Sequence, residues 1–208
     1  MSVWAESVKR GWANLVGPEA TRANTTIALG SAVVGLAGAA MWAKRSGAGG
    51  GSTTTMAVLA ADLIGGAYVN NTRASVRWYE RAGQGDADHL RFAALHGHPA
   101  VVAWADHRVG ARDNVVAWAA AQYGYMMLST AIIRRSPTHR RSLGLALTAG
   151  GLVLDRALGR STVAPWFAWS YYPKLLMGHA AGSLCPESDI GVAEPRQGSA
   201  GATDRAHH

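Results

Sequence analysis

Six apolar stretches, separated by arginine-containing breaks, constrain the fold of this chain more than any other feature. The first stretch, 25–43, contains no charged residue. A helix of about 20 apolar residues spans the roughly 30 Å hydrocarbon core of a bilayer. The other stretches are 53–71, 89–104, 114–133, 142–158 and 162–184. The sequence therefore predicts an all-α, polytopic transmembrane helix bundle with about six spans, or five if 89–104 or 142–158 is re-entrant.

The two ends of the chain are more polar than its middle. Near the N-terminus, apolar side chains recur every three or four residues, at Trp4, Val8, Trp12 and Leu15. This spacing predicts an amphipathic helix that lies in the membrane interface, and a mitochondrial presequence is the alternative. We therefore expect an interfacial segment at 1–24, a transmembrane domain at 25–184 and a polar tail at 185–208.

The chain is basic, with a formal net charge of +7, but its basic residues flank apolar stretches instead of forming one patch. This distribution argues against a nucleic-acid partner. With six spans, about two-thirds of the 20 lysine and arginine residues fall on the side that holds both termini. The positive-inside rule assigns that side to the cytoplasm or the mitochondrial matrix. The expected location is a bacterial plasma membrane or the mitochondrial inner membrane.

Asp62 is the strongest candidate for chemistry within the apolar stretches. A carboxylate near the centre of a membrane helix costs about 2.5–3.5 kcal/mol, so it usually faces a partner or a cavity. On a helix, Asp62 shares a face with Gly66 and Arg73, and Asn70 lies at the edge of that face. One interpretation is a proton relay or a general acid. The other, which we favour, is an ion pair with Lys174.

The sequence His-Gly-His-Pro at 96–99 is the most conspicuous short motif. On a continuous helix the two imidazoles point about 200° apart, so they cannot easily bind one ion. The proline disfavours helical geometry at His98, which leaves open a site with His179 or Asp62 as third ligand. His96 or His98 opposite His179 would also suit a b-type haem. Neither pattern is specific, and the sequence predicts no metal site and no cofactor.

The last apolar stretch places Lys174 next to several aromatic residues. Its ammonium group needs a counter-charge or a path to water. It either binds a lipid head group or a quinone carbonyl, or reaches the membrane interface beyond a kink at Pro173. The candidate ligand- or lipid-binding residues are Asn70, Arg73, Tyr171, Tyr172, Lys174 and His179.

Two functions fit these features. The first is a non-catalytic accessory or structural subunit of a larger membrane complex, respiratory or otherwise bioenergetic. Its partners are the lipid bilayer and other membrane subunits, with a bound lipid or quinone as a further option. The alternative is an intramembrane enzyme or binding protein for an isoprenoid, quinone or lipid, with Asp62 as acid and His96 or His98 as base. Convergence of these side chains on one cavity would favour the alternative.

Overall fold

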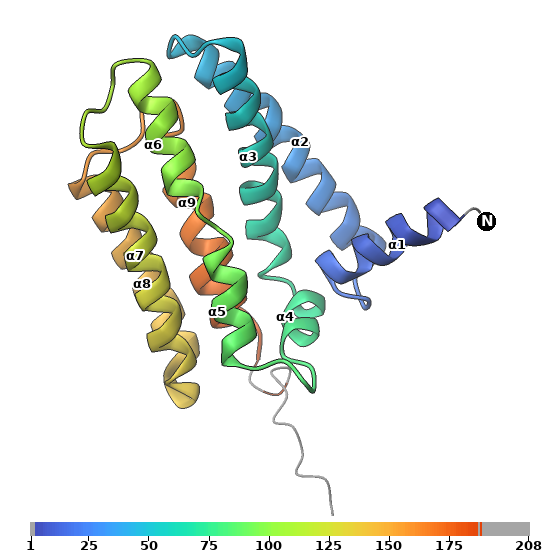
Figure 1. The fold of residues 1–208 in the computed structure, drawn as a ribbon. Coiled ribbons are helices and arrows are strands. Elements are labelled where there is room, and N and C mark those ends of the chain that lie inside the picture. Colours follow the sequence, from blue (N-terminus) through green and yellow to red (C-terminus); the bar gives the residue numbers. More distant parts are fainter. Residues whose placement is uncertain (1–2, 187, 189–208) are drawn as a thin grey trace, which may run out of the picture.

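The computed structural model describes residues 3–186 and 188, and these residues form helices without any strand (Figure 1). The helices are α1 (Val3–Val16), α2 (Arg22–Arg45), α3 (Gly50–Val69), α4 (Arg73–Tyr79), α5 (Asp86–Ala94), α6 (His98–Arg108), α7 (Val115–Arg134), η1 (Pro137–His139), α8 (Arg140–Ala157), α9 (Phe167–Tyr172) and η2 (Pro173–Ala180). The predicted all-α class is confirmed. Most of the predicted tail, residue 187 and everything from 189 on, lies outside the described residues.

Helices α2 and α3 form an antiparallel pair held at close range by small residues (Figure 1). Gly35 and Ala39 are buried on α2, and a Cβ atom at Gly35 would lie 3.1 Å from the Ala60 carbonyl oxygen of α3. Small side chains at four-residue spacing allow this approach. The connection is shorter than the glycine-rich sequence suggests, because α3 already begins at Gly50.

The stretch 89–104 is not one continuous helix, in agreement with the interruption that Pro99 predicts. It is divided into α5 and α6, which contain 9 and 11 residues. The break falls at 95–97 because Pro99 occupies the first turn of α6, where the absence of a proline N–H costs nothing. Two short helices therefore meet end to end, with the histidine motif at their junction.

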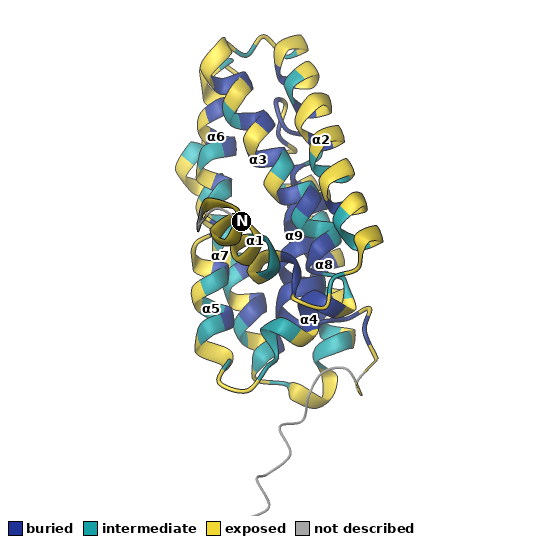
Figure 2. Cartoon of the chain, turned by 90° about the vertical axis from the view of Figure 1, so that its right-hand side faces the viewer, coloured by how far each residue is buried: buried dark blue, intermediate teal, exposed yellow. Residues whose placement is uncertain are grey.

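The last apolar stretch, 162–184, forms the centre of the bundle, and its helical structure is interrupted near Pro165 and Pro173, as these prolines predict. Helix α9 begins only at Phe167, after Pro165, and continues through Pro173 into the wider π-helical turns of η2. Pro173 cannot donate the backbone hydrogen bond that a regular helix requires at that point. Phe167, Tyr171 and Tyr172 are almost fully buried, and α9 and η2 pack against α3, α7 and α8 (Figure 2).

Helix α2 is the one helix among the described residues that is long and apolar enough to cross a membrane. Its most apolar 18-residue window has a mean hydropathy of 1.6, and most of that window faces outward (Figure 2). One such helix near an N-terminus is weak evidence for a membrane span, because signal sequences share its length and apolar composition. Among the other helices, α5 and α6 are short, and α8 carries four charged residues. The six-span arrangement therefore stays a prediction.

Helix α1 is amphipathic, as its spacing predicts, and projects away from the bundle (Figure 1). Trp4 and Val8 are exposed, whereas Val16 is buried with Ala28 and Val69, and Trp12 packs against this cluster. The attached end of α1 thus lies beside the lower halves of α2 and α3. This contact forms one wall of the site described next.

Candidate functional site

Four polar side chains from separate segments converge inside the bundle. Asp62 comes from α3, His96 from the junction of α5 and α6, His98 from the start of α6 and Lys174 from the start of η2. Lys174 Nζ lies 2.6 Å from Asp62 Oδ2, and His98 Nε2 lies 3.6 Å from the same oxygen. The predicted pairing of Asp62 with Lys174 is confirmed. The two imidazole ring centroids are 5.1 Å apart.

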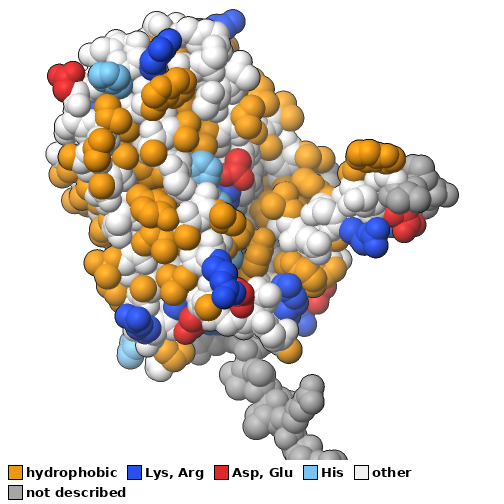
Figure 3. Space-filling model, viewed as in Figure 1, with side chains coloured by type: hydrophobic (Ala, Val, Ile, Leu, Met, Phe, Trp, Pro, Cys, Tyr) orange, Lys and Arg blue, Asp and Glu red, His pale blue; other side chains and the backbone are white. Residues whose placement is uncertain are grey.

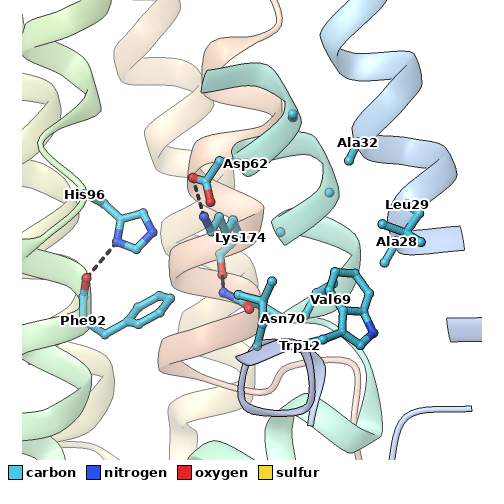
Figure 4. Close-up of a pocket in the computed structure, with 14 residues that line it drawn as sticks. Trp12, Ala28, Leu29, Ala32, Asp62, Val69, Asn70, Phe92, His96 and Lys174 are labelled. Atoms are coloured by element: carbon cyan, nitrogen blue, oxygen red, sulfur yellow. Dashed lines mark hydrogen bonds and ion pairs between the residues drawn. The ribbon is translucent and has the colours of Figure 1, made fainter. Parts of the chain in front are cut away.

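The interruption between α5 and α6 brings the two histidines together. A continuous helix would direct their rings to opposite sides, but here both lie close to Asp62. His96 is buried, and its Nδ1 lies 2.7 Å from the Phe92 carbonyl oxygen (Figure 4). Since a carbonyl only accepts, Nδ1 carries the proton and Nε2 presents a lone pair.

Lys174 reaches Asp62 through a gap left by a glycine. A Cβ atom at Gly66 would lie only 2.6 Å from Lys174 Cε, so the lysine chain fills the space that a larger residue would occupy. Asn70 Nδ2 donates to the Lys174 carbonyl oxygen at 3.2 Å and fixes the start of η2 against the end of α3 (Figure 4). The side chain of Lys174 is 4% exposed, whereas that of Asp62 is 48% exposed. The ion pair thus joins an interior cation to an accessible carboxylate.

Three of these four side chains, all but His98, lie at the polar end of a cavity of about 250 Å³. Its polar lining comes from Asp62, Asn70, His96 and Lys174. Its remaining walls are mostly apolar and come from α1, α2, α3 and α5; they include Trp12, Leu15, Ala28, Leu29, Val69 and Phe92 (Figure 4). A small molecule with one polar end and an apolar body matches this division.

A second, more open hollow lies on the other side of Asp62 and measures about 630 Å³. Thr54, Val58, His98 and Val101 contribute to its lining together with Asp62. The space-filling view shows acidic, basic and histidine side chains meeting in a hollow between α3 and the α5–α6 pair (Figure 3). The carboxylate is therefore reachable from two directions.

The structure places three of the predicted residues away from this cavity. The His179 ring stacks on Phe92 at a centroid distance of 3.8 Å, and its carbonyl oxygen lies 3.0 Å from His89 Nδ1. Because His179 lies behind Phe92, it lines neither hollow. The Tyr171 hydroxyl donates to the His96 carbonyl oxygen at 3.0 Å, and the Tyr172 hydroxyl donates to a side-chain oxygen of Gln122. Tyr171 thus supports the site from the core, whereas Tyr172 contacts α7.

Arg73, a further predicted binding residue, begins α4 and also lines neither hollow. The sequence argument missed Trp12 and Phe92 as cavity residues. A usable signal exists for Trp12, since it lies on the apolar face of an amphipathic helix. Phe92 carries no such signal, because its position depends on the break three residues later.

Comparisons with models of protein families, with curated proteins and with solved structures give no match for this chain.

Proposed function

We propose that this protein is a membrane-embedded binding protein for an amphiphilic small molecule, an isoprenoid, a quinone or a lipid. The observation that carries this proposal is the convergence of Asp62, His96 and Lys174 on one end of an otherwise apolar cavity. A buried ammonium group donates to a phosphate or carbonyl oxygen, and the unprotonated nitrogen of His96 accepts from a hydroxyl. The apolar walls then accommodate the rest of the molecule.

The proposed membrane location is supported by the outer surface of the bundle. Large apolar side chains are exposed on several helices, among them Val33, Val34, Val58, Leu95, Val116, Leu128 and Val153. Lipid tails cover such a surface without cost, whereas water does not. In a six-span arrangement, the α5–α6 pair and the α9–η2 pair each make one broken span. Broken helices are tolerated in a membrane where they are buried or line a cavity, and both breaks adjoin this site.

The same geometry supports acid–base chemistry on the bound molecule. Asp62 would give or take a proton at the accessible side of the cluster, and His98 Nε2, 3.6 Å away, would be its exchange partner. His96 is the second base, since its Nε2 faces the cavity. The accessory-subunit hypothesis stays a prediction, because exposed apolar faces suit protein partners as well as lipid.

Ligand titration of the purified protein in mild detergent tests the proposal. The probes are decylubiquinone, geranylgeranyl diphosphate and phosphatidylglycerol, followed by quenching of tryptophan fluorescence, since Trp12 lines the cavity. We expect at least one probe to bind, and Lys174→Met to weaken its binding at least tenfold, a loss of about 1.4 kcal/mol.

The matched control is Lys9→Met, which removes an exposed lysine from α1. It should leave the affinity unchanged. Equal binding by the wild type and Lys174→Met, or no binding of any probe, would reject the proposal.

A further inference from the structure

We infer that Asp62, His96 and His98 form a binding site for one divalent transition-metal ion, for which Zn²⁺ is the test probe. Each of the three side chains offers one ligand atom, and these atoms all lie within 4.8 Å of one another. The inference adds an ion to the site of the proposed function. Its test uses the metal alone, so either idea can fail without the other.

The ligand set and its spacing fit such an ion. Two imidazoles and one carboxylate are the three protein ligands of many catalytic zinc sites and of non-haem iron sites. With bonds of about 2.1 Å, ligand atoms around Zn²⁺ lie roughly 3.4 Å apart. The present spacing therefore requires side-chain movements of about 1 Å, which single rotations of exposed groups provide. The carboxylate of Asp62 is half exposed, so it can make such a movement once Lys174 no longer donates to its Oδ2.

The histidines are prepared for this role in two different ways. His96 donates its Nδ1 proton to the Phe92 carbonyl, which fixes the ring and leaves Nε2 for an ion. His98 Nδ1 is buried and has no hydrogen-bond partner among the described residues. A buried nitrogen in that state is unfavourable. The other ring nitrogen, Nε2, already lies 3.6 Å from Asp62 Oδ2, so a small rotation of the ring would place Nε2 on the ion, whereas a ring flip would place Nδ1 there.

Lys174 is the residue that competes with the metal. Its ammonium group contacts Asp62 Oδ2 at 2.6 Å and supplies the positive charge that the carboxylate needs. A dication on Asp62 repels that ammonium group, so metal binding has to displace Lys174 from the oxygen. Two consequences follow: the affinity of the wild type is moderate, and removing the lysine strengthens metal binding.

Three ligands leave at least one coordination position vacant. The two hollows on either side of Asp62 both reach the cluster, so a water molecule or the polar head of a bound amphiphile would take that position. The ion would act as a Lewis acid on that group. An ion bound to Asp62 would therefore be accessible both from the apolar cavity and from the more open hollow.

Metal titration of chelator-treated protein, purified without a histidine tag, tests the inference. A background variant with His207 and His208 replaced by alanine removes terminal ligands. Bound Zn²⁺ is counted by mass spectrometry after gel filtration, and Co²⁺ binding is followed by visible absorption. We expect one ion per chain, at least tenfold weaker binding in His98→Ala, and at least threefold tighter binding in Lys174→Met.

His139→Ala is the matched control, because His139 is exposed and distant in sequence from the cluster. It should retain one ion per chain. His98→Gln, which keeps the polarity of the side chain, replaces His98→Ala if that variant does not fold. The inference would be overturned if the wild type and the His98 variant bound Zn²⁺ with equal affinity. It would also be overturned if Lys174→Met bound Zn²⁺ no more tightly than the wild type. Amphiphile binding by the chelator-treated protein without any Zn²⁺ binding would keep the proposed function and reject only the metal site.

Discussion

Asp106 and Asp62 both pair with a cation inside the helical bundle, yet their surroundings are opposite. Asp106 is fully buried, and its Oδ1 accepts hydrogen bonds from Ser161 Oγ, Thr162 N and Val163 N at 2.9 to 3.0 Å. Its Oδ2 accepts from Arg112 Nε at 3.1 Å. Asp62 is half exposed and has one short contact, to Lys174, with two hollows beside it.

The difference separates a structural carboxylate from one suited to binding. Arg112 also donates to the Gly159 carbonyl oxygen at 3.0 Å and lies over the Trp118 ring at 4.4 Å. The hydrogen bonds of Asp106 and Arg112 thus hold the end of α6 against the segment between α8 and α9. Both oxygens of Asp106 and the guanidinium group of Arg112 take part in them. Around Asp62, polar groups face open space, so a ligand can join them without breaking the fold. Polar groups whose hydrogen bonds are all made within the protein stabilise the fold, whereas polar groups with unused hydrogen-bonding capacity can bind a ligand.

The largest effect on stability is expected from Asp106→Ala. The substitution leaves Arg112 as an unpaired buried charge and removes the acceptor for two backbone amides, at a cost of about 3–5 kcal/mol. Thermal unfolding followed by circular dichroism measures the loss. Asp113→Ala, at an exposed position seven residues away in sequence, is the control and should change stability by less than about 0.5 kcal/mol. A loss below about 1 kcal/mol for Asp106→Ala would show that its network is not structural.

An intermediate effect on stability is expected at the Asp62–Lys174 pair, and double variants compare this pair with Asp106–Arg112. Asp62→Asn should cost about 1–3 kcal/mol, because it leaves the buried ammonium group of Lys174 without its carboxylate. Adding Lys174→Met should recover most of that loss, since this pair has few other partners. Adding Arg112→Met to Asp106→Ala should recover little, because the two backbone amides still lack an acceptor. If both double variants recovered a similar share of the lost stability, the two carboxylates would not differ in how far other hydrogen bonds hold them in the fold.

The contrast also explains what the sequence could predict. Asp62 and Lys174 stand out because each interrupts an apolar stretch, and a charge in that setting requires a partner. Asp106 does not stand out, because it is followed by a histidine and an arginine and resembles a solvated helix end. Asp155 has the same appearance, because Arg156 follows it near a helix end, and its sequence context resembles an ordinary charged helix end. It is instead buried and accepts from Gln122 Nε2 at 2.9 Å.

The burial of Asp106 and the burial of Asp155 escape sequence reasoning for one physical reason. Whether a polar group near a helix end is buried depends on which distant segment covers it, as residues 161–163 cover Asp106. Helix periodicity contains no information about that contact. The histidine pair was predictable in part: Pro99 indicates that His98 departs from helical geometry, but the sequence does not show that the break at 95–97 brings both rings close to Asp62.

The smallest effect on stability is expected from Trp12→Ala, together with a clear loss of amphiphile affinity. Trp12 lines the cavity and its Nε1 lies 3.4 Å from Thr25 Oγ1, but α1 otherwise projects away from the bundle. We expect a stability loss below about 1 kcal/mol and an amphiphile affinity reduced about fivefold, which corresponds to roughly 1 kcal/mol. Because the substitution removes one reporter, isothermal titration calorimetry replaces fluorescence as the measurement. Trp4→Ala removes the same side chain from an 82% exposed position on α1 and should leave the affinity unchanged. Equal losses in both variants would mean that α1 contributes membrane attachment and not a cavity wall, in which case the Asp62 cluster would lose the apolar partner that distinguishes it from Asp106.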